Sequence, residues 1–203
     1  MAMSLTACGD TSKTGSTAEE TAKQEETTKE SENTEKAEES TLVYGSGDYT
    51  RINPAMDEHC EINVLLFSGL TAHDADDQVI PGLAEKWEYD EDSYTYTFHI
   101  RDGIKWHDGE AFTADDVKFT IDRLKDSNTI YSANVQHVTT VEVVDSTTIR
   151  ITLDQEVPFF EYNLTFPILS SSYYSDKEFN PDIVPVGTGM YKVSDVQNSA
   201  LIL

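Results

Sequence analysis

The chain has 203 residues, a length typical of one or two domains. Its 38 acidic and 14 basic residues give a formal net charge of −24, which would repel nucleic acid and anionic lipid surfaces, so we expect neither as a partner. The acidic surface mainly favours solubility and is only a weak indication of a cationic ligand.

The N-terminus contains a short motif typical of bacterial lipoproteins. Leu5-Thr6-Ala7-Cys8 matches the lipobox, in which small residues let a signal peptidase cut before a cysteine that carries diacylglycerol. We therefore expect residues 1–8 to be the remnant of a lipoprotein signal and Cys8 to be lipidated, which would anchor the protein to the membrane. A basic segment and a long apolar core are missing before Cys8, so export of the chain as written stays open.

Residues 9–41 lack aromatic and large aliphatic side chains and are rich in Thr, Ser, Glu and Lys. Such a segment cannot bury enough apolar surface to offset the entropy that is lost when its backbone becomes ordered. A helix rich in Glu and Lys is one interpretation, but the Thr and Ser content favours a disordered tether.

Folded structure is expected from Leu42 onward. A strand at 41–44 ends in the turn-prone segment Gly45-Ser46-Gly47-Asp48. Apolar residues at helical spacing predict a helix over 61–67, and the alternating pattern of 94–101 predicts a strand.

A second helix is predicted to begin at Thr113, because two acidic residues follow in its first turn. Its expected apolar face comprises Val117, Ile121 and Leu124. Two β-rich runs, 138–144 and 147–153, flank Asp145-Ser146 and predict a hairpin.

The remaining elements are a short helix that begins at Pro158-Phe159-Phe160, a strand over 187–193 and an apolar strand over 200–203. This mixture predicts an α/β fold with an α+β region. Because the chain stops inside an apolar strand, we expect it to be part of a longer fold.

Four segments, in order and at consistent spacing, resemble one protein family. They are Ile52-Asn53-Pro54, Phe67-Ser68-Gly69-Leu70, the long run over 79–121 with Ile100-Arg101-Asp102-Gly103-Ile104-Lys105-Trp106-His107-Asp108-Gly109, and Pro185-Val186-Gly187-Thr188-Gly189-Met190-Tyr191. Together they resemble the family 5 extracellular solute-binding proteins, which bind peptides, dipeptides, nickel complexes and similar solutes.

The resemblance implies a periplasmic-binding-protein-like fold of type II, cluster C, whose two lobes close on a ligand. By analogy, residues 42–70 begin the first lobe, residues 71–184 form its inserted subdomain, and residues 185–203 return to that lobe. The second lobe would then be absent from this chain. An incomplete sheet exposes a strand edge, so we expect this part alone to be poorly stable and prone to association.

The resemblance also implies a function. We expect a lipid-anchored, extracytoplasmic receptor of an ABC importer, monomeric at full length, that captures di- or oligopeptides and delivers them to a membrane permease. A nickel or metal-chelate receptor of the same family is the alternative, and a cell-surface domain without a transport role is an alternative of another class.

An enzyme is not expected, and neither is a cofactor. The sequence has no Gly-x-Ser-x-Gly elbow, no His-Glu-x-x-His motif and no phosphate-binding glycine-rich loop. His73, His99 and His137 lack the spacing of metal ligands, so no metal site is predicted and each is interpreted as a structural or surface residue.

The first candidate ligand-binding segment is Asp57-Glu58-His59-Cys60. Two carboxylates, an imidazole and a thiol within four residues are able to bind a cation or a free amine. The alternative is an N-terminal helix cap with the cysteine packed inward. The second segment is Gly45-Ser46-Gly47-Asp48, whose backbone is suited to strand addition with an extended peptide, although the same glycines also suit a plain turn.

Tyr131 is the third candidate, because some members of the family offer an aromatic wall to the ligand at this position. The alternative for Tyr131 is a core tyrosine. Trp106-His107-Asp108-Gly109 is interpreted as an Asp-Gly turn over a packed tryptophan and not as a site. No arginine occurs in 164–169 or near Asn128, where nickel-complex receptors would need one, and this favours peptides, although His59-Cys60 points the other way.

Overall fold

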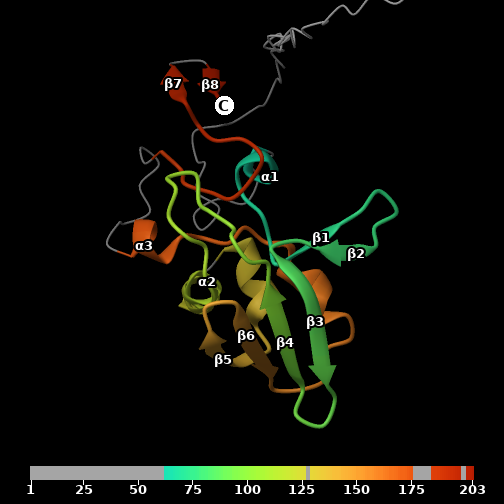
Figure 1. Cartoon of the computed structure of the whole chain (residues 1–203). Helices are drawn as coiled ribbons and strands as arrows, with labels where there is room; N and C mark the ends of the chain where they lie inside the picture. Colours follow the sequence, from blue (N-terminus) through green and yellow to red (C-terminus); the bar gives the residue numbers. More distant parts are fainter. Residues whose placement is uncertain (1–61, 127–128, 176–183, 198–199) are drawn as a thin grey trace, which may run out of the picture. The chain divides into compact units, whose positions relative to one another are not determined.

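The central element of the structure is an antiparallel sheet with strand order β3-β4-β6-β5. The computed structural model describes residues 62–126, 129–175, 184–197 and 200–203 (Figure 1). The strands of this sheet are β3 (Ala84–Asp90), β4 (Thr95–Ile100), β5 (Val138–Asp145) and β6 (Thr148–Leu153).

Alternation along the two inner strands gives the sheet one buried face. In β4, Tyr96, Phe98 and Ile100 are buried, while the residues between them are half-buried. Phe98 pairs with Ile149 of β6, and Tyr96 pairs with Ile151. Since side chains alternate between the faces of a strand, these pairs lie on the same side and form the centre of the main core.

Helix α2 (Ala114–Asp126) packs against β5 and β6 (Figure 1). Val117, Ile121 and Leu124 are buried in the main core, and full burial of each such side chain contributes about 1.5–3 kcal/mol. Acidic residues lie in the first turn of α2 and basic residues in its last turn, where each complements the helix dipole.

The remaining elements are short. Strands β1 (Thr71–His73) and β2 (Val79–Pro81) form one hairpin, and β7 (Asp195–Gln197) pairs with β8 (Ala200–Ile202) in another. The short helices are α1 (Asn63–Leu66) and α3 (Ser171–Tyr174), and the 3-10 helices are η1 (Ile130–Val135) and η2 (Phe160–Thr165). None of the described helices is both long enough and apolar enough to cross a membrane.

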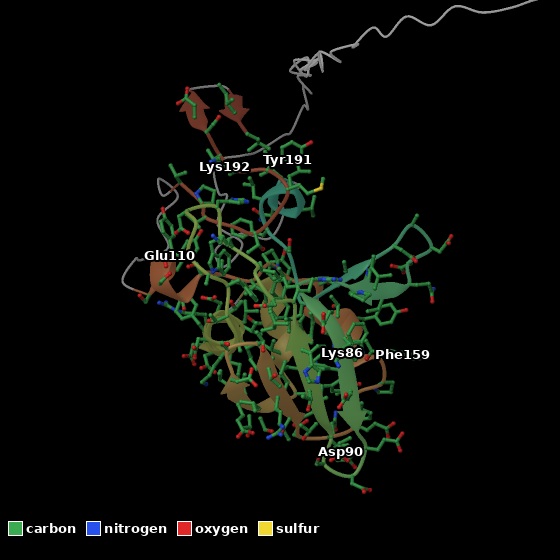
Figure 2. The ribbon with its side chains drawn as sticks, in the orientation of Figure 1. Lys86, Asp90, Glu110, Phe159, Tyr191 and Lys192 are labelled. Carbon is green, nitrogen blue, oxygen red and sulfur yellow. The ribbon has the colours of Figure 1, made fainter. Side chains whose placement is uncertain are left out.

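A second, smaller core surrounds α1. It is formed by Ile62, Leu66, Phe67, Leu169 and Tyr174. The segment 187–191 packs so closely on α1 that their backbones are hydrogen-bonded. The N–H of Gly189 donates to the carbonyl of Leu66 at 2.9 Å. The N–H of Tyr191, which is labelled beside α1 in Figure 2, donates to the carbonyl of Leu65 at 3.1 Å.

Most predicted elements are present. The helix predicted over 61–67 corresponds to α1, the strand over 94–101 to β4, and the hairpin over 138–153 to β5 and β6. The helix that begins at Thr113 and the short helix near Phe160 are also confirmed. All pairings in the described sheets are antiparallel, as expected for an α+β region.

The strand predicted over 187–193 was wrong. Gly187 and Gly189 form their hydrogen bonds with His107 and with the carbonyl of Leu66, so this segment has no strand partner, and the strand begins only at Asp195. The last predicted strand is confirmed as β8. The strand predicted at 41–44 lies outside the described residues.

Candidate ligand pocket

An open pocket of about 710 Å³ lies where α1, the β1–β2 hairpin and the segment around Thr165 meet. Its lining comes from several separate stretches of the chain. The lining residues are Asn63, Val64, Phe67, Ser68, Gly69, Thr71, Ala72, His73, Gly82, Leu83, Arg101, Ile104, Tyr131, Thr165, Pro167 and Thr188.

Two glycines let these stretches approach one another closely. A Cβ atom on Gly69 would lie 2.7 Å from the carbonyl carbon of Thr165, and one on Gly82 would lie 2.6 Å from the carbonyl oxygen of Gly69. Backbone hydrogen bonds hold the contacts, since Leu83 N–H donates to Gly69 O at 2.9 Å and Ile168 N–H donates to Ser68 O at 3.1 Å. The pocket walls are therefore fixed by main-chain packing.

The charged groups at the pocket are sparse. Arg101 is exposed and donates from Nε to the carbonyl of Gly82 at 3.0 Å. His73 lies 3.2 Å from the carboxylate of Asp77, and its ring packs on that of Tyr162 with a centroid distance of 5.1 Å. No Asp or Glu is among the described residues that line the pocket.

The polar groups of the pocket differ in their hydrogen bonding. Thr71 donates its hydroxyl to the carbonyl of Glu161 at 2.7 Å. In contrast, Asn63 Oδ1 and Thr188 Oγ1 are buried and have no hydrogen-bond partner within the part of the chain that the structure describes. Because buried polar atoms in folded proteins are nearly always paired, these two oxygens need a physical explanation.

Tyr131 is the one predicted ligand-binding residue that falls in the described part of the chain. It lies on η1, where the N–H of Thr129 donates to Ser132 Oγ at 3.1 Å in a capping box. Its half-buried ring packs near Phe166, with 6.3 Å between centroids, and it also lines the pocket. Tyr131 thus has features of both interpretations, a core tyrosine and a pocket wall.

The other predicted site residues lie outside the described residues. These are Cys8, Gly45, Ser46, Gly47, Asp48, Asp57, Glu58, His59 and Cys60. Asn63 and Val64, which follow Cys60 within four residues, both line the pocket.

The motif Trp106-His107-Asp108-Gly109 forms the predicted turn. Trp106 is buried and donates from Nε1 to Asp116 Oδ2 at 3.2 Å, and Gly109 has a φ of +95°, a conformation that glycine adopts without strain.

His107 has a role that the sequence did not reveal. Its backbone N–H donates to Gly187 O at 2.9 Å, and its Nδ1 accepts from Gly187 N–H at 3.3 Å. With Nδ1 as acceptor, the neutral ring carries its proton on Nε2, which lies 2.9 Å from Gly189 O. His107 therefore holds the residues on both sides of Thr188.

His99 and His137, which were interpreted from the sequence as structural or surface residues, each lie beside a different acidic residue. His99 lies 3.9 Å from Glu88, and His137 lies 3.1 Å from Asp154. Among the described residues there is no group of three or more His, Cys, Asp or Glu side chains with metal-binding geometry.

Two residues that line the pocket, Asn63 and Thr188, were not predicted from the sequence, although each has a sequence feature that distinguishes it. Asn63 is the single amide within the apolar run 62–67, on a helix whose other buried residue is Leu66. Thr188 lies between two glycines, which is typical of a backbone that approaches another segment closely.

A family model described as "Bacterial extracellular solute-binding proteins, family 5 Middle" matches residues 78–203. The chain belongs to this family. Members of the family are extracytoplasmic solute-binding proteins, and their solved structures have the type II periplasmic-binding-protein fold.

Individual relatives agree with this assignment. The dipeptide-binding protein of Escherichia coli (strain K12) is 36% identical over 152 residues, which are 62% of this chain and 28% of that protein. The periplasmic oligopeptide-binding protein OppA of Salmonella typhimurium is 32% identical over 164 residues, which are 68% of this chain and 30% of that protein. The chain thus spans less than a third of the length of these relatives.

Solved structures resemble the chain over a similar range. NikZ from Campylobacter jejuni, in complex with Ni(L-His), matches with a TM-score of 0.68 and 33% identity, covering 74% of this chain and 32% of NikZ. The oligopeptide-binding protein AppA from Bacillus subtilis, in complex with a nonapeptide, matches with a TM-score of 0.62 and 26% identity, covering 68% and 29% of the two chains.

Proposed function

We propose that this chain is part of an extracytoplasmic receptor of an ABC importer, which captures di- or oligopeptides and delivers them to a membrane permease. The observation that carries the proposal is an open pocket in a chain of the family 5 solute-binding proteins. The relatives named for dipeptides and oligopeptides favour peptides as the ligand class.

The character of the pocket supports this proposal. Its volume of about 710 Å³ lies within the range of roughly 300–1,000 Å³ that small-molecule sites occupy. Its lining includes both apolar residues, such as Phe67, Ile104 and Pro167, and residues with small polar side chains. Such a wall suits a ligand whose main chain is constant and whose side chains vary.

The proposed mechanism is closure and release, without a covalent step. Residues 42–70 and 185–203 would belong to the first lobe and residues 71–184 to its inserted subdomain, so that the pocket forms one half of the ligand site. A second lobe, outside this chain, would close over the ligand by a hinge motion. The role needs no cofactor and no catalytic residue.

Two further segments are proposed to line the same site. Only Glu61 separates Asp57-Glu58-His59-Cys60 from Ile62, which is followed by α1 and its pocket residues Asn63 and Val64. We also place Gly45-Ser46-Gly47-Asp48 at the rim, where its backbone would bond to an extended peptide.

Attachment to the membrane is a separate part of the proposal. A lipid on Cys8 would hold the receptor at the outer face of the membrane, and residues 9–41 would keep the folded part away from the lipid. The full-length receptor is expected to be a monomer, which suits one receptor docking on one permease.

A receptor for nickel or another metal chelate is the second candidate. The observation in its favour is the likeness to NikZ, at 33% identity, whose structure holds Ni(L-His). The two candidates differ in the ligand and share the fold and the transport role.

The decisive experiment is a thermal-unfolding screen of the full-length protein with dipeptides, oligopeptides and a nickel–histidine complex. A ligand present at 100 times its Kd stabilises the folded state by about 2.7 kcal/mol, which raises the midpoint clearly. A shift with peptides supports the peptide receptor, and a shift with nickel–histidine alone supports the second candidate. If no solute raises the midpoint, the transport role is wrong and a cell-surface domain without that role becomes the better hypothesis.

A further inference from the structure

The ring of His107 holds the segment 187–189 through both of its nitrogen atoms. Gly187 N–H donates to Nδ1 at 3.3 Å, and Nε2 lies 2.9 Å from Gly189 O. The ring must therefore accept at Nδ1 and donate at Nε2, and only the neutral form with its proton on Nε2 does both. A single protonation state of one side chain thus fixes this segment.

The opposite side of the segment packs on α1 without spare room. Gly189 N–H donates to Leu66 O at 2.9 Å, and a Cβ atom on Gly187 would overlap with the same carbonyl. Because the backbones are in direct contact, the segment cannot move closer to α1. The position of α1 relative to the loop that carries His107 therefore depends on the segment between them.

Both sides of this connection line the pocket. The loop that carries His107 also supplies Ile104, whose carbonyl accepts from Phe112 N–H at 3.0 Å and closes the loop. Thr188 lies in the segment itself, and α1 and its C-terminal end contribute Asn63, Val64 and Phe67. A shift of the segment therefore moves one wall of the pocket relative to another.

We propose that His107 is a positioning residue for the ligand pocket: its neutral ring holds residues 187–189 against α1, and its protonation at acidic pH releases them and weakens ligand binding. When Nδ1 gains a proton, two donors face each other, Nδ1–H and Gly187 N–H, and their hydrogen bond is lost. The bond from Nε2 to Gly189 O is retained, so the loss is confined to one end of the segment. This inference rests on the proposed receptor function, since ligand affinity reports the change.

The titratable and charged groups around His107 come from its own loop, from α2, from α3 and from the chain after Gly189. They are Lys105, Asp108, Glu110, Asp116, Tyr173, Tyr174, Tyr191 and Lys192. Within the described ranges, no carboxylate forms an ion pair with His107. Burial raises the pKa of Tyr173 and of Tyr174, so both phenols stay neutral at acidic pH.

Two amide variants separate the two ring nitrogens. In His107→Asn the side-chain oxygen lies near the position of Nδ1, accepts from Gly187 N–H and does not titrate. In His107→Gln the amide nitrogen lies near the position of Nε2 and donates to Gly189 O, while the acceptor is missing. We expect wild-type affinity to fall about three- to tenfold from neutral to acidic pH, the effect of one hydrogen bond. His107→Asn loses this fall, and His107→Gln binds weakly at both pH values, as the protonated wild type does.

His73→Asn is the matched control. His73 lines the pocket 3.2 Å from the carboxylate of Asp77, so its own protonation is a competing source of a pH effect. Whatever the affinity of His73→Asn at neutral pH, the fall on acidification remains if His107 causes it. His59→Asn serves the same purpose for the segment proposed to line the same site. An effect that Asp108, Glu110 or Asp116 causes would persist in His107→Asn.

The experiment uses the full-length protein and calorimetric affinity for the tightest of a panel of tripeptides built from Ala, Leu and Phe. Their side chains do not titrate, and their termini titrate alike with every variant. Affinity is measured from neutral pH down to the most acidic pH at which the empty protein stays folded. Nitrogen-15 spectra of histidine-labelled protein report the tautomer of His107 without ligand, and we expect the proton on Nε2.

Three results overturn the inference and leave the receptor function intact. They are a wild-type affinity that does not change with pH, a fall in affinity that persists in His107→Asn, and a neutral His107 ring with its proton on Nδ1. A wild-type protein that binds no peptide overturns the proposed function, and this inference with it.

Discussion

Asp116 Oδ1 accepts hydrogen bonds from both the backbone N–H and the hydroxyl of Ser171, each at 2.8 Å, across 55 residues of sequence. Its other oxygen, Oδ2, accepts from Thr113 N–H at 2.9 Å and from Trp106 Nε1 at 3.2 Å. Asp116 is only 3% exposed. One buried carboxylate therefore joins the start of α2, the start of α3 and the Trp106 turn.

Removal of this carboxylate is predicted to be strongly destabilising. Asp116→Ala leaves several buried donors without an acceptor, so we expect a loss of about 3–5 kcal/mol in the free energy of unfolding, measured by urea denaturation. The control is Asp122→Ala on the same helix, which removes an exposed pair with Lys118 at 2.7 Å and should cost about 0.5 kcal/mol or less. Equal losses in the two variants would show that the hydrogen bonds of Asp116 do not hold the three elements together.

Gly187 is predicted to tolerate no side chain. A Cβ atom there would overlap with the carbonyl of Leu66, so Gly187→Ala must push the segment away from α1, at a cost of about 2–4 kcal/mol in unfolding free energy. Gly103→Ala is the comparison, because Gly103 has a φ of +75° and open space around its Cα, so that only backbone strain of about 1–2 kcal/mol arises. A smaller loss at Gly187 than at Gly103 would contradict the close approach.

Tyr174 is predicted to make stability fall at alkaline pH. Burial, the largest cause, raises the pKa of Tyr174 above its ordinary value of 10.0, although a hydrogen bond from Val186 N–H opposes the shift. Below pH 10 the phenol of Tyr174 is neutral in both the folded and the unfolded chain. Above pH 10 the phenol ionises first in the unfolded chain, so the free energy of unfolding decreases as the pH rises. Tyr174→Phe should flatten the decline in urea midpoint above pH 10 while lowering the midpoint at pH 7, where Val186 loses its acceptor. An unchanged slope would show that Tyr174 ionises equally in both states.

Tyr131 is predicted to contribute to ligand affinity. Tyr131→Ala removes an aromatic wall from the pocket, so we expect peptide affinity to fall about tenfold by calorimetry, with a modest loss of stability because its packing near Phe166 is lost. Tyr94→Ala, at a half-exposed turn outside the pocket, should bind peptide as the wild type does. If Tyr131→Ala binds peptide with wild-type affinity, Tyr131 is a core residue and does not contact the ligand.

Cys8 is predicted to anchor the protein. Cys8→Ser cannot accept diacylglycerol, so we expect the full-length protein to move from the membrane fraction to the soluble extracytoplasmic fraction, with a mass that lacks the lipid. Cys60→Ser retains Cys8 and should stay in the membrane fraction. Membrane association of Cys8→Ser would rule out this lipid as the anchor.

The sequence alone was enough for the elements whose cause is local. The apolar spacing of Val117, Ile121 and Leu124 predicted α2, and the alternating runs on either side of Asp145-Ser146 predicted β5 and β6. In each case the residues that set the backbone conformation are neighbours in sequence, so periodicity and turn chemistry carried the information.

Strand β3 and the segment after Gly187 were beyond such reasoning. Exposed and half-buried residues of β3 alternate only from Lys86 to Asp90, because a register shift between Ala84 and Lys86 interrupts the pattern, and the strand pairs along its length with β4. Gly187, Thr188 and Gly189 resemble the start of a strand in sequence, yet the hydrogen bonds of the two glycines go to a histidine 80 residues away and to α1.

The same limit applies to the candidate pocket. The sequence indicated the family and suggested Tyr131, because motifs and residue types can be recognised without coordinates. Only the tertiary structure brought Asn63 and Thr188 to one pocket and left their oxygens unpaired. Whether a buried polar atom has a partner depends on segments that are distant in sequence, so the hydrogen bonding of such atoms is decided by the fold.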